Sequence, residues 1–267
     1  MNDSLRNSLW NFMRDQISDD RYSGRYSRQS VEILAVNVLR VPVETIDGGG
    51  PRWWLYARVQ EIPWFTVYEL LEFMANHLDR FVVAPPHAQV QNQTAFRDTV
   101  NRILENENAG CRFVGGVLTE VTSPAEIEAI EKAMKDAESH GLGAVHTHIK
   151  QALELLGKKP EPDYRNAIKE AISAVESAAN LIQGGKKMTL DPALDLLDKR
   201  LKLHRAFKDA LSKLYGYTSD DSGIRHALMD EPTVDSADAR FFIVACSAFV
   251  SWLIVKADQA GLLNPGS

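Results

Sequence analysis

The sequence has few of the features that mark secreted, disulfide-stabilised or nucleotide-binding proteins. It contains only 2 cysteines in 267 residues, Cys111 and Cys246, which excludes a disulfide framework and is typical of small core residues in a reducing compartment. It has no Walker loop, dinucleotide fingerprint or nucleophile elbow. Residues 1–20 are polar and charged, so they do not resemble a secretory signal. We therefore expect a cytoplasmic protein.

Long apolar runs and an excess of positive charge are also missing. The longest apolar run, residues 241–255, is shorter than the ~20 residues of a membrane span and has charged residues at both ends. It therefore predicts the buried central helix of a bundle and no membrane partner. The formal net charge of -6 argues against a protein that coats nucleic acid nonspecifically, because that binding needs a basic surface. A local basic groove is still compatible with this charge.

The residue patterns divide the chain into two parts that differ in tryptophan content and in expected secondary structure. Residues 1–137 contain most of the tryptophans and a mixture of helix and strand patterns, whereas residues 138–267 read almost entirely as helix. A charged stretch rich in small residues, Lys135–Gly143, joins them and predicts a domain boundary there. The expected fold is mainly α: an α+β N-terminal domain followed by an antiparallel helical bundle.

The first part begins with an amphipathic helix over residues 5–17, and residues 64–78 and 95–107 also have helical patterns. Residues 31–39 fit a helix or a strand. Gly48–Gly50 are followed by Pro-Arg-Trp-Trp and not by a helix start, so they indicate a loop and not a phosphate-binding turn.

A β-hairpin is the clearest local prediction in the first part. Two apolar runs within residues 111–121 flank Gly115-Gly116, and Ser123-Pro124-Ala125-Glu126 then supplies an N-cap, a first-turn proline and a capping-box glutamate for a helix. Helix, helix, hairpin, helix is also the order of a winged helix-turn-helix. The second helix carries two arginines but also Asp98, Glu105 and Glu107, which would repel phosphate. We therefore favour a structural or partner-binding role over DNA binding by this half.

The second part predicts a bundle of helices joined by short links. The expected helices cover residues 144–156, 164–183, 190–214 with a break near Lys202, a short helix around Arg225, and 236–260. The polar face of the 164–183 helix is expected to carry Arg165, Lys169, Glu170, Ser173 and Glu176.

Two clusters have both a functional and a structural interpretation. The first consists of Trp53, Trp54, Tyr56 and Trp64, which could stack a base, although such a cluster is more often the core of a small domain. The second consists of His140, His146 and His148. Residues two apart on a helix point to different faces, and no cysteine or acid stands at a zinc-ligand spacing nearby, so we expect no metal and no cofactor.

Arg225 and His226 are the strongest candidates for catalysis. A guanidinium can bind a phosphate through two hydrogen bonds and stabilise the charge of a pentacoordinate phosphorane. An imidazole can take a proton from a ribose 2′-hydroxyl or give one to the leaving oxygen. Together they suffice for metal-independent cleavage of RNA, with Glu176 and Arg165 in supporting positions. Alternatively, Arg225 pairs with an acid such as Glu176, and His226 caps a helix.

Several longer sequence segments resemble those of a known protein family. Three segments of the second part resemble the HEPN domain at the C-terminus of bacterial AbiJ-type abortive-infection proteins. They are PDYRNAIKEAISAVE (162–176), KLYGYTSDDSGIRHAL (213–228) and ARFFIVACSAFVSWLIVKA (239–257). Three segments of the first part resemble the N-terminal domain that accompanies this HEPN domain. They are VYELLEFM, LENENAGCRFVGG and SPAEIEAIEKAM. The resemblance implies a helical bundle that forms a homodimer with a composite RNA-cleaving site across the two-fold axis.

The sequence departs from the HEPN ribonuclease pattern at one point. In active members, an arginine and a histidine are separated by four to six residues; after Arg225 these spacings end at Asp230, Glu231 and Pro232, and only the adjacent His226 is available. Two hypotheses therefore stand. The chain is an antiphage endoribonuclease that uses Arg225 and His226, or it is a noncatalytic dimeric regulator that binds RNA, a nucleotide or a protein partner.

Overall fold

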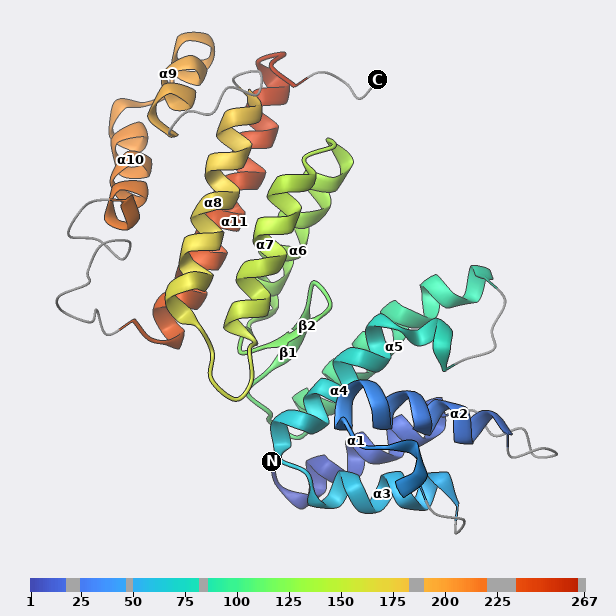
Figure 1. Ribbon diagram of the computed structural model, residues 1–267. Helices are drawn as coiled ribbons and strands as arrows, with labels where there is room; N and C mark the ends of the chain where they lie inside the picture. Colours follow the sequence, from blue (N-terminus) through green and yellow to red (C-terminus); the bar gives the residue numbers. More distant parts are fainter. Residues whose placement is uncertain (18–24, 47–49, 82–85, 183–189, 220–233, 264–267) are drawn as a thin grey trace. The chain divides into compact units, whose positions relative to one another are not determined.

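The computed structural model describes residues 1–17, 25–46, 50–81, 86–182, 190–219 and 234–263 (Figure 1). These residues are mainly helical and include one two-stranded hairpin, so the predicted mainly α class is confirmed. The chain divides into two compact units, Met1–Leu118 and Thr119–Ser267.

In the first unit the described residues form five α-helices and the hairpin. They are α1 (Asp3–Gln16), α2 (Arg25–Leu34), α3 (Pro51–Glu61), α4 (Trp64–Asn76), α5 (Pro86–Asn106), β1 (Arg112–Val114) and β2 (Val117–Thr119, whose last residue belongs to the second unit). Short turns of other helix types cover Ala35–Leu39 (π), Val43–Thr45 (3-10) and Leu78–Arg80 (3-10).

The predicted N-terminal helix is confirmed. Leu5, Leu9, Met13 and Ile17 recur every four residues and are buried, and Asn2 caps the helix by accepting a hydrogen bond from the Leu5 N–H at 2.8 Å. The ambiguous stretch 31–39 is helical: α2 continues into the π-helical turn, which ends at Arg40 with a positive φ of 54°.

The expectation that no helix follows the glycines was wrong. Gly50, with a φ of 122°, is the N-cap of α3, and Pro51 occupies its first turn. Proline is well suited to that position because its missing N–H would have no partner there and its φ is already helical. The other two glycines of the run, Gly48 and Gly49, lie outside the described residues.

The predicted hairpin is confirmed, with its two glycines at the turn. Gly115 and Gly116 have φ values of 56° and 88°, as a two-residue hairpin turn requires.

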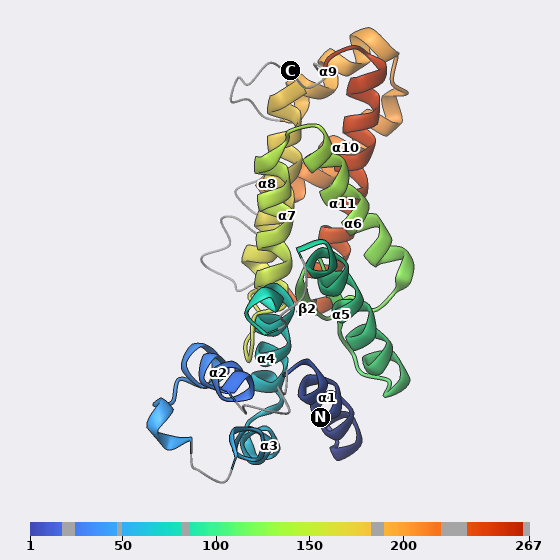
Figure 2. The same ribbon diagram turned by 90° about the vertical axis from the view of Figure 1, so that its right-hand side faces the viewer.

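Six helices form the described part of the second unit. They are α6 (Pro124–Ser139), α7 (Gly143–Leu156), α8 (Tyr164–Ile182), α9 (Leu190–Leu201), α10 (Arg205–Ser219) and α11 (Ser236–Gln259). Figure 2 shows α6, α7, α8 and α11 side by side, and the pairs α6–α7, α7–α8, α8–α11 and α6–α11 are in contact.

The bundle is not wholly antiparallel, which corrects the prediction. The first residue of α11, Ser236, is hydrogen-bonded to the first residue of α8, Tyr164, and Arg240 of α11 lies 3.8 Å from Glu126 in the first turn of α6. Helix α11 therefore runs in the same direction as α6 and α8. The stretch of chain between α8 and α11 runs back along α8, because Tyr215 of α10 contacts Glu176 and Ser236 of α11 contacts Tyr164.

The apolar run predicted as a central helix lies in α11. By length and composition alone this helix could cross a membrane, but 56% of its most apolar window is buried inside the unit. Ile243, Val250 and Leu253 are among its fully buried side chains.

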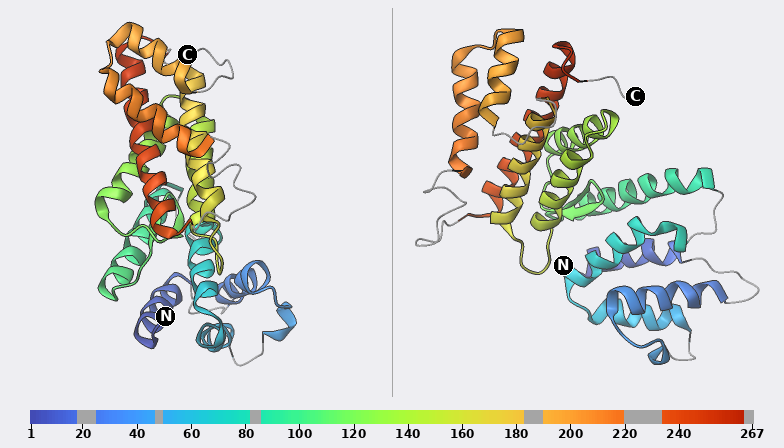
Figure 3. Two further views of the ribbon diagram at one scale, coloured as in Figure 1. Left: turned by 90° about the vertical axis from the view of Figure 1, so that its left-hand side faces the viewer. Right: turned by 45° about the horizontal axis from the view of Figure 1, so that its top comes forward.

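Helices α9 and α10 form a separate hairpin beside α8 and α11 (Figure 3). The predicted break is confirmed at Lys202, which has a φ of 52° and lies between the two helices. No described side chain of α10 is buried, in contrast to the four or more buried residues of α6, α7 and α11.

The structural units meet at residues 118–119, whereas the sequence predicted a boundary at 137–138. The helix between these positions, α6, packs against α7 and α11. Ser123 is its N-cap, as predicted, but makes no side-chain capping hydrogen bond. The predicted capping glutamate, Glu126, lies beside Arg240 instead.

Candidate functional site

The predicted catalytic pair, Arg225 and His226, falls in residues 220–233, outside the described part of the chain. The described residues that flank this stretch belong to α10 and α11. Both flanks contact α8, the helix that carries the predicted supporting residues Arg165 and Glu176.

Tyr215 joins the later turns of α10 to α8. Its hydroxyl donates a hydrogen bond to Oε1 of Glu176 at 2.5 Å in a partly buried position. A hydrogen bond to a carboxylate is stronger than one between neutral groups, so this contact fixes the Glu176 side chain. Glu176 is thereby held by a residue that precedes Arg225 by ten positions.

On the other flank, a capping box starts α11. Oδ1 of Asp235 accepts hydrogen bonds from the backbone N–H groups of Ala237 and Asp238, and the Asp238 carboxylate accepts one from the Asp235 N–H. Ser236 donates a hydrogen bond to Glu120 and is also hydrogen-bonded to Tyr164. Burial and the Glu120 carboxylate raise the pKa of Tyr164, so its hydroxyl stays protonated at neutral pH.

The polar face of α8 lies between these two anchoring contacts. Arg165, Lys169, Ser173 and Glu176 follow one another at intervals of four, four and three residues, which places them on one face of the helix. Arg165 and Glu176 are separated by about 16 Å along the axis. One phosphate therefore cannot contact both, and the face is a stripe with cations toward its N-terminal end and a carboxylate at the other.

A histidine–carboxylate pair that the sequence did not reveal lies between α7 and α8. Nδ1 of His148 is 2.7 Å from Oε2 of Glu170, and both side chains are partly buried. Two antiparallel helices place residues at similar distances from their link beside each other, and that spacing is the signal that could have indicated the pair. The other two histidines of the predicted cluster are not part of it: His140 bonds the Asp136 carbonyl at 2.8 Å, and His146 is half-buried.

Within the described ranges no three histidine, cysteine or acidic side chains gather in a way that could hold a metal ion.

A small apolar cavity of about 10 Å³ lies where α10 covers α8, α9 and α11. Its lining residues are Ile172, Val175, Leu190, Leu211, Tyr215, Phe242, Cys246 and Phe249. Burial raises the pKa of the Cys246 thiol to about 12, so the thiol is protonated and unreactive at neutral pH. The cavity holds few polar groups and is too small for a nucleotide, so it is part of the packing beneath α10.

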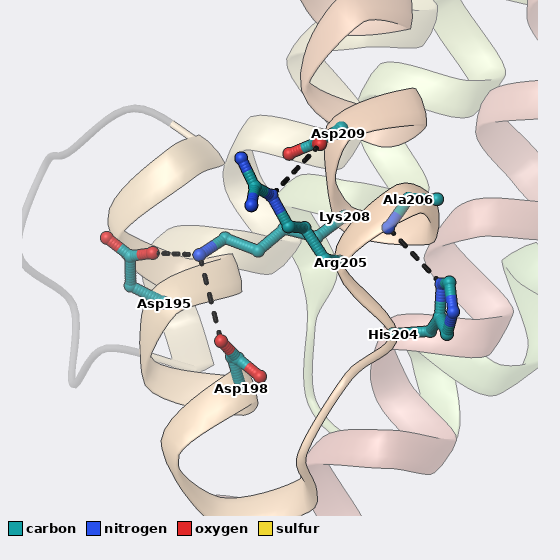
Figure 4. Close-up of polar contacts among 7 residues, drawn as sticks. All are labelled: Asp195, Asp198, His204, Arg205, Ala206, Lys208 and Asp209. Atoms are coloured by element: carbon teal, nitrogen blue, oxygen red, sulfur yellow. Dashed lines mark hydrogen bonds and ion pairs between the residues drawn. The ribbon is translucent and has the colours of Figure 1, made fainter.

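The contacts that hold α10 to α9 are polar and largely exposed (Figure 4). Lys208 is hydrogen-bonded to Asp195 and lies 3.9 Å from Asp198, while Ser212 donates a hydrogen bond to Asp191 at 2.6 Å. His204 caps α10, because its Nδ1 accepts a hydrogen bond from the Ala206 N–H at 3.2 Å. The chain thus has a second adjacent histidine–arginine pair, His204–Arg205, on the surface.

In the first unit, side chains of α4 and α5 hold the hairpin. Asn101 accepts a hydrogen bond from the Phe113 N–H at 2.6 Å and donates one to the Phe113 carbonyl at 3.2 Å. Glu72 accepts one from the Leu118 N–H, and Asn76 donates one to the Gly116 carbonyl. Side chains therefore bind backbone groups on the outer edge of each strand. Strand edges covered in this way are protected from pairing with a further strand.

The same contacts bear on the winged-helix interpretation. Arg97, one of the two arginines of the helix that would read DNA, donates a hydrogen bond to Asn76 at 3.0 Å and packs near Gly116. This arginine supports the turn of the hairpin. The arrangement favours a structural role, which is one of the two alternatives to DNA binding that we expected for the hairpin.

The aromatic cluster is divided between core and surface. Trp54 is buried and Tyr56 half-buried, whereas Trp53 is 73% exposed and Trp64 is 44% exposed. Tyr56 contacts the Trp53 ring edge to face and the Trp10 ring at a tilt of 53°. The core interpretation therefore fits Trp54, and Trp53 is left as an exposed ring.

Comparison with known proteins identifies the first half of the chain. A family model described as AbiJ N-terminal domain 4 matches residues 1–136, which is just over half of the sequence. The chain belongs to this family. The name places the family in the context of abortive infection, in which bacteria resist phage. Neither the curated proteins nor the solved structures contain a match.

The AbiJ N-terminal domain 4 region extends beyond the first structural unit. It contains α1 to α5, the hairpin and most of α6. Because α6 packs against α7 and α11, the last helix of the family region is also part of the core of the second unit.

Proposed function

We propose that the chain is a cytoplasmic antiphage protein of the abortive-infection type whose second unit is a HEPN-type, metal-independent endoribonuclease. Arg225 binds the scissile phosphate and His226 acts as acid or base. Family membership supports the antiphage role. The observation that carries the enzymatic part is that both described flanks of residues 220–233 are anchored on α8, at Glu176 and at Tyr164.

The anchoring supports the proposal because it limits where Arg225 and His226 can act. The chain leaves α10 near Glu176 and enters α11 beside the first turn of α8, and Arg165, Lys169 and Ser173 lie between these two points. The two cations can attract the RNA backbone next to the reacting phosphate, despite the net charge of -6. Glu176 supports the site indirectly, through its bond to Tyr215.

The proposed reaction needs no metal ion. The ribose 2′-oxygen attacks the adjacent phosphorus while the imidazole of His226 accepts the 2′-hydroxyl proton. The guanidinium of Arg225 neutralises the charge that develops on the phosphorane oxygens. The bond from phosphorus to the 5′-oxygen breaks, and that oxygen takes up a proton. The products are a 2′,3′-cyclic phosphate and a 5′-hydroxyl end.

The test is incubation of purified protein with total RNA in EDTA, with mapping of the chemical ends. Wild type should give 5′-hydroxyl ends, and Arg225→Ala and His226→Ala should each lose at least about a hundredfold in rate. Arg205→Ala is the matched control, because Arg205 lies next to a histidine and its side chain is 94% exposed. Cleavage that survives both site substitutions would refute the assignment, as would cleavage lost equally in the control.

The noncatalytic regulator is the second candidate. Two observations favour it: no histidine follows Arg225 at the HEPN spacing, and the Glu176 carboxylate is already held by Tyr215. In that case the homodimer binds RNA, a nucleotide or a protein without cleaving it. Fluorescent RNA that binds without being cut, with affinity reduced by Arg225→Ala, would support this candidate over the enzyme.

A further inference from the structure

Helix α11 carries an apolar stripe that the described residues of its own unit cover only in part. The stripe comprises Phe241, Ala245, Ala248, Trp252 and Val255. Phe241 is 59% exposed and Val255 is 45% exposed, Ala248 is exposed, and the other two are half-buried. Phe207 of α10 contacts the Trp252 ring at 5.1 Å between centroids, so α10 covers part of that ring.

The spacing of the stripe is that of a helix–helix seam. Its members follow at intervals of four, three, four and three residues, which is the heptad repeat of a coiled coil. All are apolar. A helix that is apolar on every side is normally buried on every side, and here 56% of the most apolar window is buried. A further helix is thus the partner that the pattern fits.

We propose that this stripe pairs with the same stripe of a second copy of the chain, with the two α11 helices antiparallel about a two-fold axis between Ala245 and Ala248. In that register Phe241 lies opposite the partner copy's Trp252 position, and Ala245 lies opposite the partner copy's Ala248 position. Aromatic layers at both ends enclose alanine layers at the centre, where small side chains let the helices approach to ~8 Å.

Charge complementarity selects this orientation. Asp238 and Lys256 lie on the same side of the stripe, 18 residues apart, and the antiparallel register brings each beside the other in the partner copy. A parallel pair would leave Asp238 and Lys256 at opposite ends of the pair, ~27 Å apart along the axis. A membrane is a poorer occupant, because the opposite face of α11 is packed on α6 and α8 and would have to leave them.

This inference extends the homodimer in the proposed function by assigning its contact surface, and it is tested by mass and not by RNA cleavage. The full chain should have twice its mass of 29.8 kDa in light scattering at about 20 µM. Ala248→Glu should reduce the mass to that of one chain by placing a charge in the apolar seam. The matched control is Ala144→Glu, at an exposed position in the first turn of α7, which should remain dimeric.

Disulfide trapping tests the orientation and does not depend on a disruptive variant. Ala237→Cys and Val255→Cys stand ~27 Å apart along α11, and the antiparallel register brings each near the other in the partner copy. A mixture of the two variants should crosslink at least about tenfold more than either alone. The native thiols Cys111 and Cys246 are buried and should contribute little.

Three results would overturn the inference: a single-chain mass for the wild type, a dimer that survives Ala248→Glu, or single variants that crosslink while their mixture does not. Binding of monomers to phospholipid vesicles through the stripe would also overturn it, in favour of a membrane. A dimer without RNA cleavage would leave the inference standing and count against the enzyme alone. Cleavage by a monomer would overturn the dimer and leave the enzyme standing.

Discussion

The β-hairpin of the first unit and helix α10 of the second are both held by side chains, but by side chains of different kinds. Asn101, Asn76 and Glu72 bind backbone groups of the hairpin, and the two groups bound by Asn101 belong to the buried residue Phe113. Helix α10 is held mainly by hydrogen bonds and ion pairs to carboxylates, several of them exposed, and by a few ring contacts.

The difference in these contacts predicts that the hairpin and α10 differ in how readily they open. A buried backbone group that loses its partner costs the free energy of its desolvation, whereas an exposed ion pair contributes little and is screened by salt. The hairpin should therefore stay closed, and α10 should open more readily. Each region has its own reporter, because Cys111 precedes β1 and Cys246 lies beneath α10, and both thiols are buried and outside any disulfide.

The largest effect is expected at Asn101. Asn101→Ala removes the partners of both backbone groups of Phe113 and should lower the stability of the hairpin by about 3 kcal/mol. Labelling of Cys111 by a thiol reagent should accelerate ~100-fold, and that of Cys246 should not change. Asn106→Ala, an exposed position on the same helix, is the control. An unchanged Cys111 rate would show that the hairpin does not depend on Asn101.

A smaller effect is expected at the turn of the hairpin. In Gly116→Ala the new methyl group would stand 3.2 Å from Oδ1 of Asn76 and 3.3 Å from Nη2 of Arg97, at a φ of +88°. We expect a loss of about 1–2 kcal/mol, measured by the same Cys111 labelling. Gly110→Ala should be nearly neutral, since no heavy atom lies within 4 Å of its added carbon. Equal effects of the two substitutions would contradict the geometry.

Tyr215 offers the corresponding test on α10. Tyr215→Phe keeps the ring in the cavity lining and removes the hydroxyl that binds Glu176, so we expect a loss of about 1 kcal/mol in the attachment of α10. Cys246 labelling should accelerate by roughly fivefold while Cys111 keeps its rate. The control is Tyr56→Phe in the first unit, which should leave the Cys246 rate as it is.

The smallest effect should come from salt. Raising the salt concentration to 1 M should accelerate Cys246 labelling by roughly threefold, because it screens Lys208 from Asp195 and Asp198, and Lys208→Ala should remove that dependence. If Cys111 responded to salt as strongly as Cys246, the comparison between the two regions would fail.

The pH dependence of the same contact follows from the direction of two shifts. The hydrogen bond from Lys208 lowers the pKa of Asp195, and the bond to Asp195 raises the pKa of Lys208. The contribution of Asp195 is therefore complete above the ordinary aspartate pKa and is lost as pH falls through the lowered value. That of Lys208 is lost only as pH rises through its raised value. Hydrogen exchange of α10, corrected for intrinsic rates, should be flat across neutral pH and increase only at either extreme.

Features that depend on a few consecutive residues were predictable from the sequence. The hairpin follows from two glycines between apolar runs, and the break between α9 and α10 lies at Lys202 as expected. The buried face of α1 was also predictable, because its apolar residues recur at helical spacing within one short segment.

Features that depend on the arrangement of helices were not predictable. The common direction of α8 and α11 requires knowing that the chain between them runs back along α8, which the contacts of Tyr215 and Ser236 show. The pair His148–Glu170 and the binding of Asn101 to Phe113 join residues that only the tertiary structure brings together. The expected capping role of Glu126 was wrong because Arg240, more than a hundred residues later, lies beside it.

The predicted domain boundary and the boundary of the compact units lie at different positions. The predicted boundary at 137–138 rests on a stretch with few large apolar residues, and the family region ends near it, at residue 136. In the structure that stretch is the end of α6 and a tight turn into α7, and the compact units meet earlier, at residues 118–119. Composition marks where a chain turns, but it does not show which unit a helix packs in.

The position of α11 in the bundle also sets the order in which the protein can mature on the ribosome. Helices α6, α7 and α8 emerge first, yet each forms part of its contacts with α11, which is synthesised after α9 and α10. The second unit therefore cannot complete its core until translation has passed residue 259. A nascent chain would accordingly hold a finished first unit well before the second has its core, and premature termination upstream of α11 would leave the core of the second incomplete.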